Sequence, residues 1–359
     1  MHRMFGDIYK GRRVLITGHT GFKGSWLAFW LKQLGAHVCG YALPPNTEPS
    51  HYQLLKPAVR SVEEDLRNRD VMETVFSAYR PEIVFHLAAQ PLVRKSYKDP
   101  LETFEVNVMG TANVLETCRK TDSVKAVVVI SSDKCYENRE QIAGYTESDP
   151  MGGHDPYSAS KGCTELIAAS YRKSFLHEAG ILLATARAGN VIGGGDWAED
   201  RLIPDAMRAA SDGEVMILRN PASVRPWQHV LEPLSGYLLL GQRLFEGDNT
   251  CAEGWNFGPD EESFITTEHA LELLQKGWNA IQFEHQPDAG APHEAKLLRL
   301  NCEKAQSRLG WQPVWNTETA FRKTAVWYRE YYTAYNLLTQ KDLDDYIRDA
   351  EEKGLIWIN

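Results

Sequence analysis

Two side chains that together could abstract a proton stand four residues apart in the sequence YSASK, namely Tyr157 and Lys161. Residues at this spacing share one face of a helix, so the lysine can lie beside the tyrosine. A neighbouring ammonium group favours the phenolate and lowers the pKa of the phenol. A phenolate is a suitable base for taking a hydroxyl proton while the carbinol hydrogen leaves as hydride. The pair alone is common by chance, so its meaning depends on the residues that accompany it.

An apolar run over residues 127–130 has the composition of a buried strand and ends in the polar sequence SSDKCY. Open α/β sheets bind their ligands at the carboxyl ends of their strands. We therefore expect Ser132 to hold a substrate hydroxyl near Tyr157, with Asp133 and Lys134 beside it.

A glycine-rich turn with the pattern GxxGxxG follows the first predicted strand and opens a helix that ends near Gly35. Glycines allow a tight turn and let the backbone approach a pyrophosphate, and the helix N-terminus offers N–H groups to the anion. The residues expected to hold a dinucleotide are Gly18, His19, Thr20, Gly21, Phe22, Lys23 and Gly24.

The choice between NAD and NADP depends on the end of the second strand, which reads GYAL at 40–43. This stretch has neither the acidic residue that usually binds the ribose hydroxyls nor an arginine for a 2′-phosphate. The lack of a phosphate partner favours NAD. Further cofactor contacts are expected after the third and fourth strands, from Asp65, Leu66, Leu87, Ala88 and Ala89.

Six short apolar runs alternate with amphipathic stretches between Arg12 and about Arg187, as in parallel strands joined by crossover helices. Their nearly continuous apolar character is typical of strands buried on both faces. We predict a Rossmann-type, doubly wound α/β fold. Strands are expected at 14–17, 37–43, 59–65, 83–89, 125–132 and 181–188, and helices near 22–34, 68–79, 101–120 and 157–178.

This alternation weakens after Gly189. We expect a dinucleotide-binding domain with the catalytic residues at 1–189, and a smaller mixed α/β substrate lobe at 190–359 whose chain crosses back to the first domain. Its helices are expected near 201–211, 266–277, 302–309 and 317–335. Three consecutive glycines in GGGDWAED at 193–200 let the backbone approach a ligand, so we expect this segment to be a hinge or to line the site.

Composition indicates an ordinary globular protein and argues against several classes of partner. The net charge is −9 and no Lys/Arg block exceeds three residues, which argues against a nucleic-acid surface. The sequence shows neither a signal pattern nor a stretch apolar enough to cross a membrane, so we expect a cytoplasmic protein. Six cysteines without a CxxC pair fit buried thiols in a reducing compartment.

The glycine turn, the strand-end serine and YxxxK occur in an order that resembles the extended short-chain dehydrogenase/reductase family over nearly the whole chain. The resemblance implies a catalytic set of Ser132, Tyr157 and Lys161, with Asn107 as a fourth member that orders the lysine. It also implies a homodimer, or a higher homo-oligomer, formed through the helices near 101–120 and 157–178.

Four longer segments are similar to those of the CDP-glucose 4,6-dehydratases: SSDKCYENRE at 131, DPMGGHDPYSASKG at 149, ARAGNVIGGGDWAEDRLIPD at 186 and RPWQHVLEPLSGYLLL at 225. This resemblance implies that CDP-glucose is oxidised at carbon 4, loses water across carbons 5 and 6, and receives the same hydride at carbon 6. The product would be CDP-4-keto-6-deoxyglucose, NAD would be regenerated in each turnover, and the pathway would supply deoxysugars for a bacterial surface polysaccharide such as the O-antigen of lipopolysaccharide.

Related dehydratases follow the catalytic serine or threonine with an Asp-Glu pair, in which Asp is the acid for the leaving hydroxyl and Glu the base for carbon 5. Here the pair reads Asp133, Lys134. Asp133 can keep the acid role if its surroundings raise its pKa. Lys134 can be the base only if it is neutral, which burial or the nearby Lys161 would promote. The alternative is that Lys134 pairs with Asp133 and that the base lies elsewhere.

The nucleotide diphosphate and the sugar need hydrogen-bond donors. Arg201, Arg219 and Arg225 lie in the part of the chain where the family binds the diphosphate, and arginine suits bidentate phosphate recognition. For each arginine the alternative is a solvated surface charge. Other candidates for the substrate pocket are Gln90 and Arg94 in the loop at 90–96, Asn190, and His293. No HxH or HExxH spacing occurs, so no metal is expected.

Two other readings share these motifs. A 4,6-dehydratase for another nucleotide, or a nucleotide-sugar 4-epimerase, would have the same triad and glycine turn, although an epimerase needs no acid after Ser132. A catalytically silent dinucleotide-binding regulator could lose Tyr157 or Lys161 without penalty, and both are present.

Overall fold

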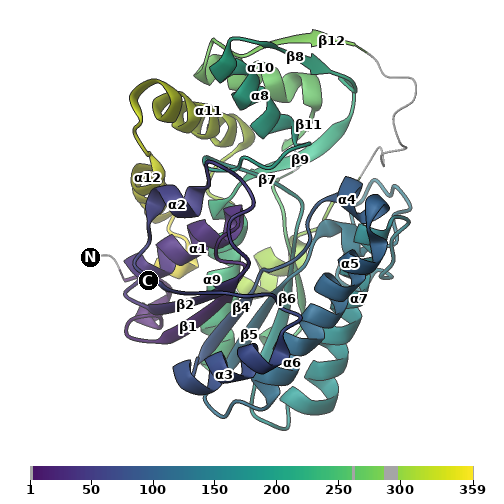
Figure 1. The fold of residues 1–359 in the computed structure, drawn as a ribbon, viewed down its shortest axis with the longest axis vertical. Coiled ribbons are helices and arrows are strands. Elements are labelled where there is room, and N and C mark those ends of the chain that lie inside the picture. The colour runs from purple at the N-terminus through teal and green to yellow at the C-terminus, as the bar shows by residue number, and fades with distance from the viewer. Residues whose placement is uncertain (1–2, 261–262, 287–297, 359) are drawn as a thin grey trace.

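A parallel sheet of seven strands forms the centre of the protein, whose computed structural model describes residues 3–260, 263–286 and 298–358 (Figure 1). The strand order is β10-β6-β5-β4-β1-β2-β3. The predicted Rossmann-type fold is confirmed, and each of the six predicted strands is present. The strands are β1 (Arg13–Thr17), β2 (His37–Ala42), β3 (Arg60–Glu63), β4 (Ile83–His86), β5 (Ala126–Ile130), β6 (Leu182–Ala188) and β10 (Gly254–Phe257).

Helices cover both faces of this sheet, which explains why its strands are apolar without alternation. Val14 and Ile16 of β1 share a cluster with Trp26 of the first helix, whereas Leu15 between them shares another with Leu115 on the opposite face. The first face is covered by α1 (Phe22–Gln33) and α9 (Leu231–Phe245), and the second by α3 (Arg69–Tyr79), α6 (Gly110–Arg119) and α7 (Pro156–Tyr171).

The helix predicted at 101–120 consists of three consecutive parts. A π-helical turn, η2 (Glu105–Met109), separates α5 (Pro100–Phe104) from α6, and a similar turn, η4 (Arg172–Leu176), extends α7. A π-turn changes the angular position of the side chains that follow it and is frequent at functional sites. Here the turn contains Asn107, whose side chain is buried against α7.

A second lobe stands above the sheet in Figure 1 and has its own apolar core. It contains a three-stranded sheet in the order β11-β9-β7 and a two-stranded sheet, β12-β8. Its strands are β7 (Asn190–Ile192), β8 (Val215–Leu218), β9 (Val224–His229), β11 (Phe264–Thr266) and β12 (Gln282–His285). Its helices are α8 (Leu202–Asp212), α10 (Thr267–Gly277) and α11 (Thr317–Ala334). The short helices α2 (His51–Leu55) and α4 (Val93–Lys98) belong to loops of the first lobe.

Three segments from the second half of the chain lie against the central sheet. Helix α9 is buried on nearly every side, and β10 extends the sheet beside β6. After α12 (Thr339–Glu352), the turn η8 (Ile356–Ile358) stacks Trp357 on Phe5, so the two ends of the described chain meet, as Figure 1 shows. The helices α9 and α12 and the strand β10 are not among the elements predicted from the sequence.

The three glycines at 193–195 accommodate the protein's own aromatic side chains. A Cβ on Gly194 would lie 1.9 Å from the ring of Trp327, and one on Gly195 would lie 2.5 Å from the ring of His51. The prediction that these glycines admit a ligand is therefore wrong for Gly194 and Gly195. They let a loop of the second lobe pack against α11 and α2.

All six cysteines are free thiols, and five of them are buried, as expected. In the described part of the chain, no helix is both long enough and apolar enough to cross a membrane.

A buried carboxylate on α9 anchors the C-terminal part of the chain. Glu232 accepts hydrogen bonds from the backbone N–H groups of Val314 and Trp315, each at 2.8 Å, and from the hydroxyl of Tyr346 at 2.8 Å. Burial raises the pKa of Glu232 to about 7, although these three donors oppose the shift.

Substitution Glu232→Ala is expected to lower the free energy of unfolding by about 3 kcal/mol, because it leaves buried donors without an acceptor. Since the folded-state pKa lies above the unfolded value, Glu232 contributes most below about pH 4.5 and loses that contribution as the pH rises through about 7. Denaturant titrations at several pH values measure both effects. The exposed Glu246→Ala is the control, with a change below about 0.5 kcal/mol; equal effects of the two substitutions would contradict the assignment.

Candidate active site

The glycine turn between β1 and α1 makes a close contact between two backbones. Gly18 has φ +79°, and a Cβ there would lie 2.7 Å from the backbone nitrogen of Ala88. A Cβ on Gly24 would lie 2.0 Å from the carbonyl oxygen of Gly18. The N-cap residue of α1 is Gly21, which has no side chain to accept a hydrogen bond. The first N–H groups of the helix therefore point to the turn without a side-chain cap. This is the geometry that binds an anionic group at a helix N-terminus.

Other predicted cofactor residues surround this turn. Leu87, Ala88 and Ala89 follow β4, and the Ala88 N–H donates to Thr17 Oγ1 at 3.3 Å. Thr20 donates to the Leu43 carbonyl at 2.8 Å. The ring of His19 fills the space above Gly40 and pairs with Ser61 Oγ at 2.8 Å, and burial lowers the pKa of this histidine to about 4.

Asp65 and Leu66 lie after β3 on the side of α6. The carboxylate of Asp65 accepts hydrogen bonds from the Arg67 side chain at 3.0 and 2.7 Å, which hold the pKa of that carboxyl below its usual value. Leu66 is buried against Gly110. The Arg67 contacts engage both carboxylate oxygens of Asp65, whose role toward a cofactor stays a prediction.

The residues after β5 meet the start of α7. Ser132 donates a hydrogen bond to Asp133 Oδ1 at 2.9 Å, and a hydrogen bond with the same serine lowers the pKa of Tyr157. All three side chains are buried, with relative exposures of 9%, 5% and 8%. The position of Tyr157 is fixed because Asp155 caps α7 through the Ser158 N–H and Ser96 accepts from the Tyr157 N–H.

Burial controls the protonation of these groups. It raises the pKa of Asp133, an effect that Lys134, Ser132 and Lys23 oppose. It also raises the pKa of Tyr157 to about 12, with Ser132 and Arg201 acting in the opposite direction. The predicted lowering of the Tyr157 pKa by Lys161 is therefore wrong, because desolvation of the phenolate outweighs the favourable charges.

Lys161 lies one turn along α7 and is 5% exposed. Burial lowers its pKa to about 8, although Glu165 favours the charged form. Asn107 reaches α7 through Ser160 rather than through the lysine: its Nδ2 donates to Ser160 Oγ at 2.9 Å. Its amide also binds the backbone of Gln90, so Asn107 joins the loop after β4 to the catalytic helix.

Lys23 is the predicted cofactor residue whose position adds most to the site. Its amine interacts electrostatically with Arg201, Asp133 and Lys161. Burial, with Arg201 and Lys161, lowers the pKa of Lys23 to about 8, while Asp133 raises it. The amine of Lys23 therefore lies near Asp133 at the end of β5. The glycine pattern of the sequence does not predict this proximity.

A buried ion pair supports the site from the far side of α7. Glu165 accepts two hydrogen bonds from Arg187 of β6, at 2.9 and 2.8 Å, and one from Thr185 at 2.7 Å. Arg187 also donates to the Tyr136 hydroxyl at 2.5 Å. The pair lies one helical turn beyond Lys161 and ties α7 to β6, the strand next to the edge strand β10. The ion pair is not predicted from the sequence, because Glu165 lies within a predicted helix and Arg187 within a predicted apolar strand.

The predicted substrate residues differ in how they meet this centre. Arg201 binds Asp196 at 2.7 Å and interacts electrostatically with Tyr157. Arg225 lies on β9 and donates to its neighbour's carbonyl, and Asn190 lies half-buried on β7. Gln90 is engaged within its own loop, with bonds to Leu92 and Thr103, so its amide supports the loop instead of facing a sugar.

Two other arginines are exposed. Arg94 forms a 2.6 Å ion pair with Asp200, which links the loop after β4 to the second lobe. Arg219 follows β8 with its side chain exposed, so for this residue the surface reading is the simpler one. His293 lies outside the described residues.

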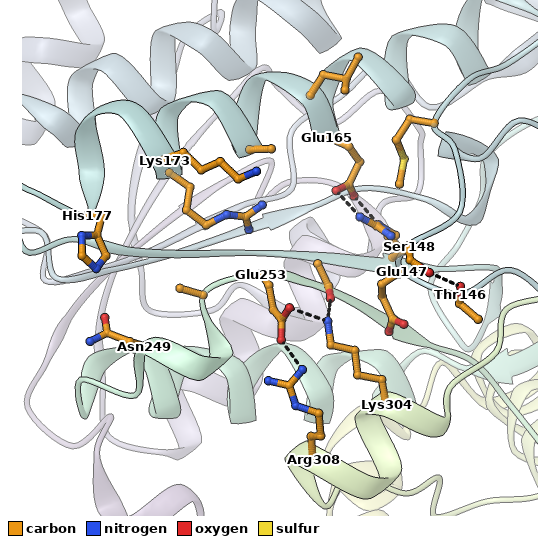
Figure 2. A pocket seen from close by; sticks show the side chains of 17 residues that line it. Thr146, Glu147, Ser148, Glu165, Lys173, His177, Asn249, Glu253, Lys304 and Arg308 are labelled. Carbon is orange, nitrogen blue, oxygen red and sulfur yellow. Dashed lines mark hydrogen bonds and ion pairs between the residues drawn. The ribbon is translucent and has the colours of Figure 1, made fainter.

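A separate cavity of about 790 Å³ opens on the outer side of α7 (Figure 2). Glu165 lies at the upper right of the view, Lys173 and His177 lie at the left, and Lys304 and Arg308 lie below. Both of these lower cations share the carboxylate of Glu253. None of the residues predicted to do chemistry lines this cavity, so the candidate active site is the buried centre around Ser132 and Tyr157.

Comparisons with known proteins agree with this architecture. Residues 15–324 match the family described as GDP-mannose 4,6 dehydratase. A CDP-glucose 4,6-dehydratase of Salmonella typhimurium is 47% identical over 350 residues, which cover 95% of this chain and 98% of that protein.

Two solved structures share the fold. A UDP-glucose 4-epimerase of Thermus thermophilus in complex with NAD has a TM-score of 0.74 and 26% identity, covering 88% of this chain and 99% of the other. A dTDP-glucose 4,6-dehydratase of Bacillus anthracis in complex with NAD has a TM-score of 0.74 and 22% identity, covering 89% and 97%.

Substitution Glu165→Leu is expected to lower the free energy of unfolding by about 3 to 5 kcal/mol, because it leaves the buried Arg187 charge uncompensated. The double variant Glu165→Leu/Arg187→Met should recover most of this loss, since it removes both charges. Denaturant titration of the two variants and the parent measures the difference. A double variant no more stable than the single one would show that the ion pair is not what holds α7 to β6.

Proposed function

Because this chain belongs to the GDP-mannose 4,6-dehydratase family, we propose that it is a CDP-glucose 4,6-dehydratase that converts CDP-glucose to CDP-4-keto-6-deoxyglucose and water with bound NAD. The observation that carries the proposal is the position of Asp133. A buried carboxyl with a raised pKa, hydrogen-bonded to the triad serine, supplies the acid that a dehydration needs and an epimerisation does not. The choice of CDP rests on the similarity along nearly the full chain.

NAD fits the glycine turn on geometric grounds. The turn brings Gly18 so close to Ala88 and Gly24 that side chains there would collide with backbone, and it leaves the first N–H groups of α1 open toward a pyrophosphate. The residues that would hold NAD are those of the turn, together with the stretch after β4. When bound, NAD supplies a reversible hydride acceptor next to the sugar.

Oxidation at carbon 4 requires a base for the hydroxyl proton, and we assign this role to Tyr157. Burial raises the pKa of this phenol, Arg201 opposes that shift, and the positive charge of the oxidised nicotinamide would oppose it further. Ser132 orients the reacting hydroxyl, and Lys161 lies one helical turn after Tyr157 on α7. Asn107 positions this helix through Ser160.

Elimination across carbons 5 and 6 requires an acid for the leaving hydroxyl, which we assign to Asp133. The carboxylate that remains after proton donation is stabilised by Lys134 and Lys23, both of which lower the pKa of Asp133. The elimination also requires a base for the carbon 5 proton, and an amine can be this base only in its neutral form. We propose Lys134, in the 3₁₀ turn after Ser132, as the base. Lys23 is a second amine near the same acid.

The remaining assignments concern partners and context. Arg201 and Arg225 are the proposed donors to the nucleotide diphosphate, and Asn190, on the strand β7 that pairs with β9, is a further candidate for substrate contact. We further propose a cytoplasmic homodimer or higher homo-oligomer, paired through α5, η2, α6 and α7, where Leu101, Met109 and Leu166 are exposed. The product would enter deoxysugar synthesis for a bacterial surface polysaccharide.

The proposal predicts that the purified protein with NAD removes one water molecule from CDP-glucose, without net reduction of the cofactor. Mass spectrometry of parallel reactions with CDP-, UDP-, GDP- and dTDP-glucose measures this. Water loss from another nucleotide sugar alone would keep the chemistry and overturn the CDP assignment. An epimerised sugar of unchanged mass would overturn the dehydratase, and no change with any of them would favour the silent regulator.

Substitution Asp133→Asn is expected to slow water loss by about a hundredfold to ten-thousandfold, the usual contribution of a positioned acid. Because Tyr157 is intact, a 4-keto sugar that still carries its 6-hydroxyl should accumulate on the enzyme, detectable after rapid acid quench. The exposed Asp122→Asn is the control and should leave the rate unchanged. Undiminished water loss in the Asp133 variant would place the acid elsewhere.

A further inference from the structure

The proposed reaction ends with two side chains in a protonation state that differs from the one in which they began. The following inference rests on that reaction. Tyr157 takes the carbon 4 hydroxyl proton during oxidation. Asp133 gives a proton to the carbon 6 hydroxyl, which leaves as water. The proton that the base takes from carbon 5 returns to carbon 5 when the carbon 6 position is reduced. After one turnover, Tyr157 therefore has one proton more than at the start and Asp133 has one fewer.

One hydroxyl interacts with both of these groups. Ser132 donates to Asp133 Oδ1 at 2.9 Å, and its interaction with the phenol lowers the pKa of Tyr157. The same serine lowers the pKa of Asp133, so its hydroxyl favours the charged form of each group. Its direction suits a transfer, because a hydroxyl that donates to the carboxylate can accept from the phenol.

We propose that the hydroxyl of Ser132 returns the proton from Tyr157 to Asp133 after each turnover. The O–H bond of Tyr157 breaks and a new O–H bond forms on Ser132 Oγ, while the original serine proton moves to Asp133 Oδ1. The products are the phenolate and the carboxylic acid that start the next cycle, and no proton is exchanged with water.

The surroundings favour this internal route over exchange with solvent. The three side chains are 8%, 9% and 5% exposed, so bulk water has little access to them. Burial of Asp133 and the charge of Arg201 favour the transfer, because they favour the carboxylic acid and the phenolate, whereas burial of Tyr157 and the charge of Lys23 oppose it. The two protonation states of the pair thus each have a cation nearby, which keeps the transfer reversible.

The test compares the first turnover with later ones in the full-length protein with NAD and CDP-glucose, by rapid quench over a series of buffer concentrations at constant pH and ionic strength. Ser132→Ala should form one product per site in a first phase and then turn over at least about tenfold more slowly, at a rate that rises with buffer concentration. Ser132→Thr, which keeps the hydroxyl, and the parent should show no dependence on buffer.

Several results would overturn the relay. Later turnovers of Ser132→Ala as fast as its first, or slow later turnovers that buffer does not accelerate, would limit Ser132 to orienting the substrate. A parent rate that rises with buffer concentration would show that the proton passes through solvent, even if the alanine variant failed to fold. Absence of water loss in the parent protein would instead refute the proposed function itself.

Discussion

The carboxyl ends of β1, β4 and β5 lie side by side at one edge of a parallel sheet, and every feature of the site depends on this pairing. Parallel strands all end at the same edge, so loops remote in sequence meet there without long connections. The turn after β1 touches the backbone after β4 at Gly18 and Ala88, and the turn after β5 brings Ser132 to Tyr157. The turn that can bind an anion and the centre of acid-base residues therefore lie next to each other as a result of the strand order.

The same edge is buried, and burial sets the chemistry of its side chains. Desolvation raises the pKa of Asp133 and Tyr157 and lowers that of Lys23 and Lys161, so each shift favours the uncharged form. An uncharged acid can donate a proton and a neutral amine can accept one, which are the states that acid-base chemistry requires. Side chains that stay charged in this region are paired with an opposite charge. Glu165 of α7, for example, forms a buried ion pair with Arg187 of β6.

The sequence allowed prediction of those parts whose physical signal is local. Strands buried on both faces read as continuous apolar runs, and a strand, a glycine turn and a helix follow each other within one short stretch. Helix α9 contains Pro233 and two glycines, which are not typical of a helix, and β10 reads GWNF without a β-branched residue. The environment of Tyr157 could not be predicted, because its pKa depends on burial by residues far along the chain. The acidic residue Glu165 within the predicted helix was the one local indication of the ion pair with Arg187.

In the proposed reaction, one buried centre oxidises carbon 4 of a nucleotide sugar and returns the same hydrogen to carbon 6 of that molecule. CDP-glucose with deuterium at carbon 4 tests this transfer, followed by NMR and mass spectrometry of the product. We expect one deuterium at carbon 6 of the 4-keto-6-deoxy sugar and none released to water. Deuterium that stays at carbon 4, or that is lost to solvent before carbon 6 is reduced, would contradict it.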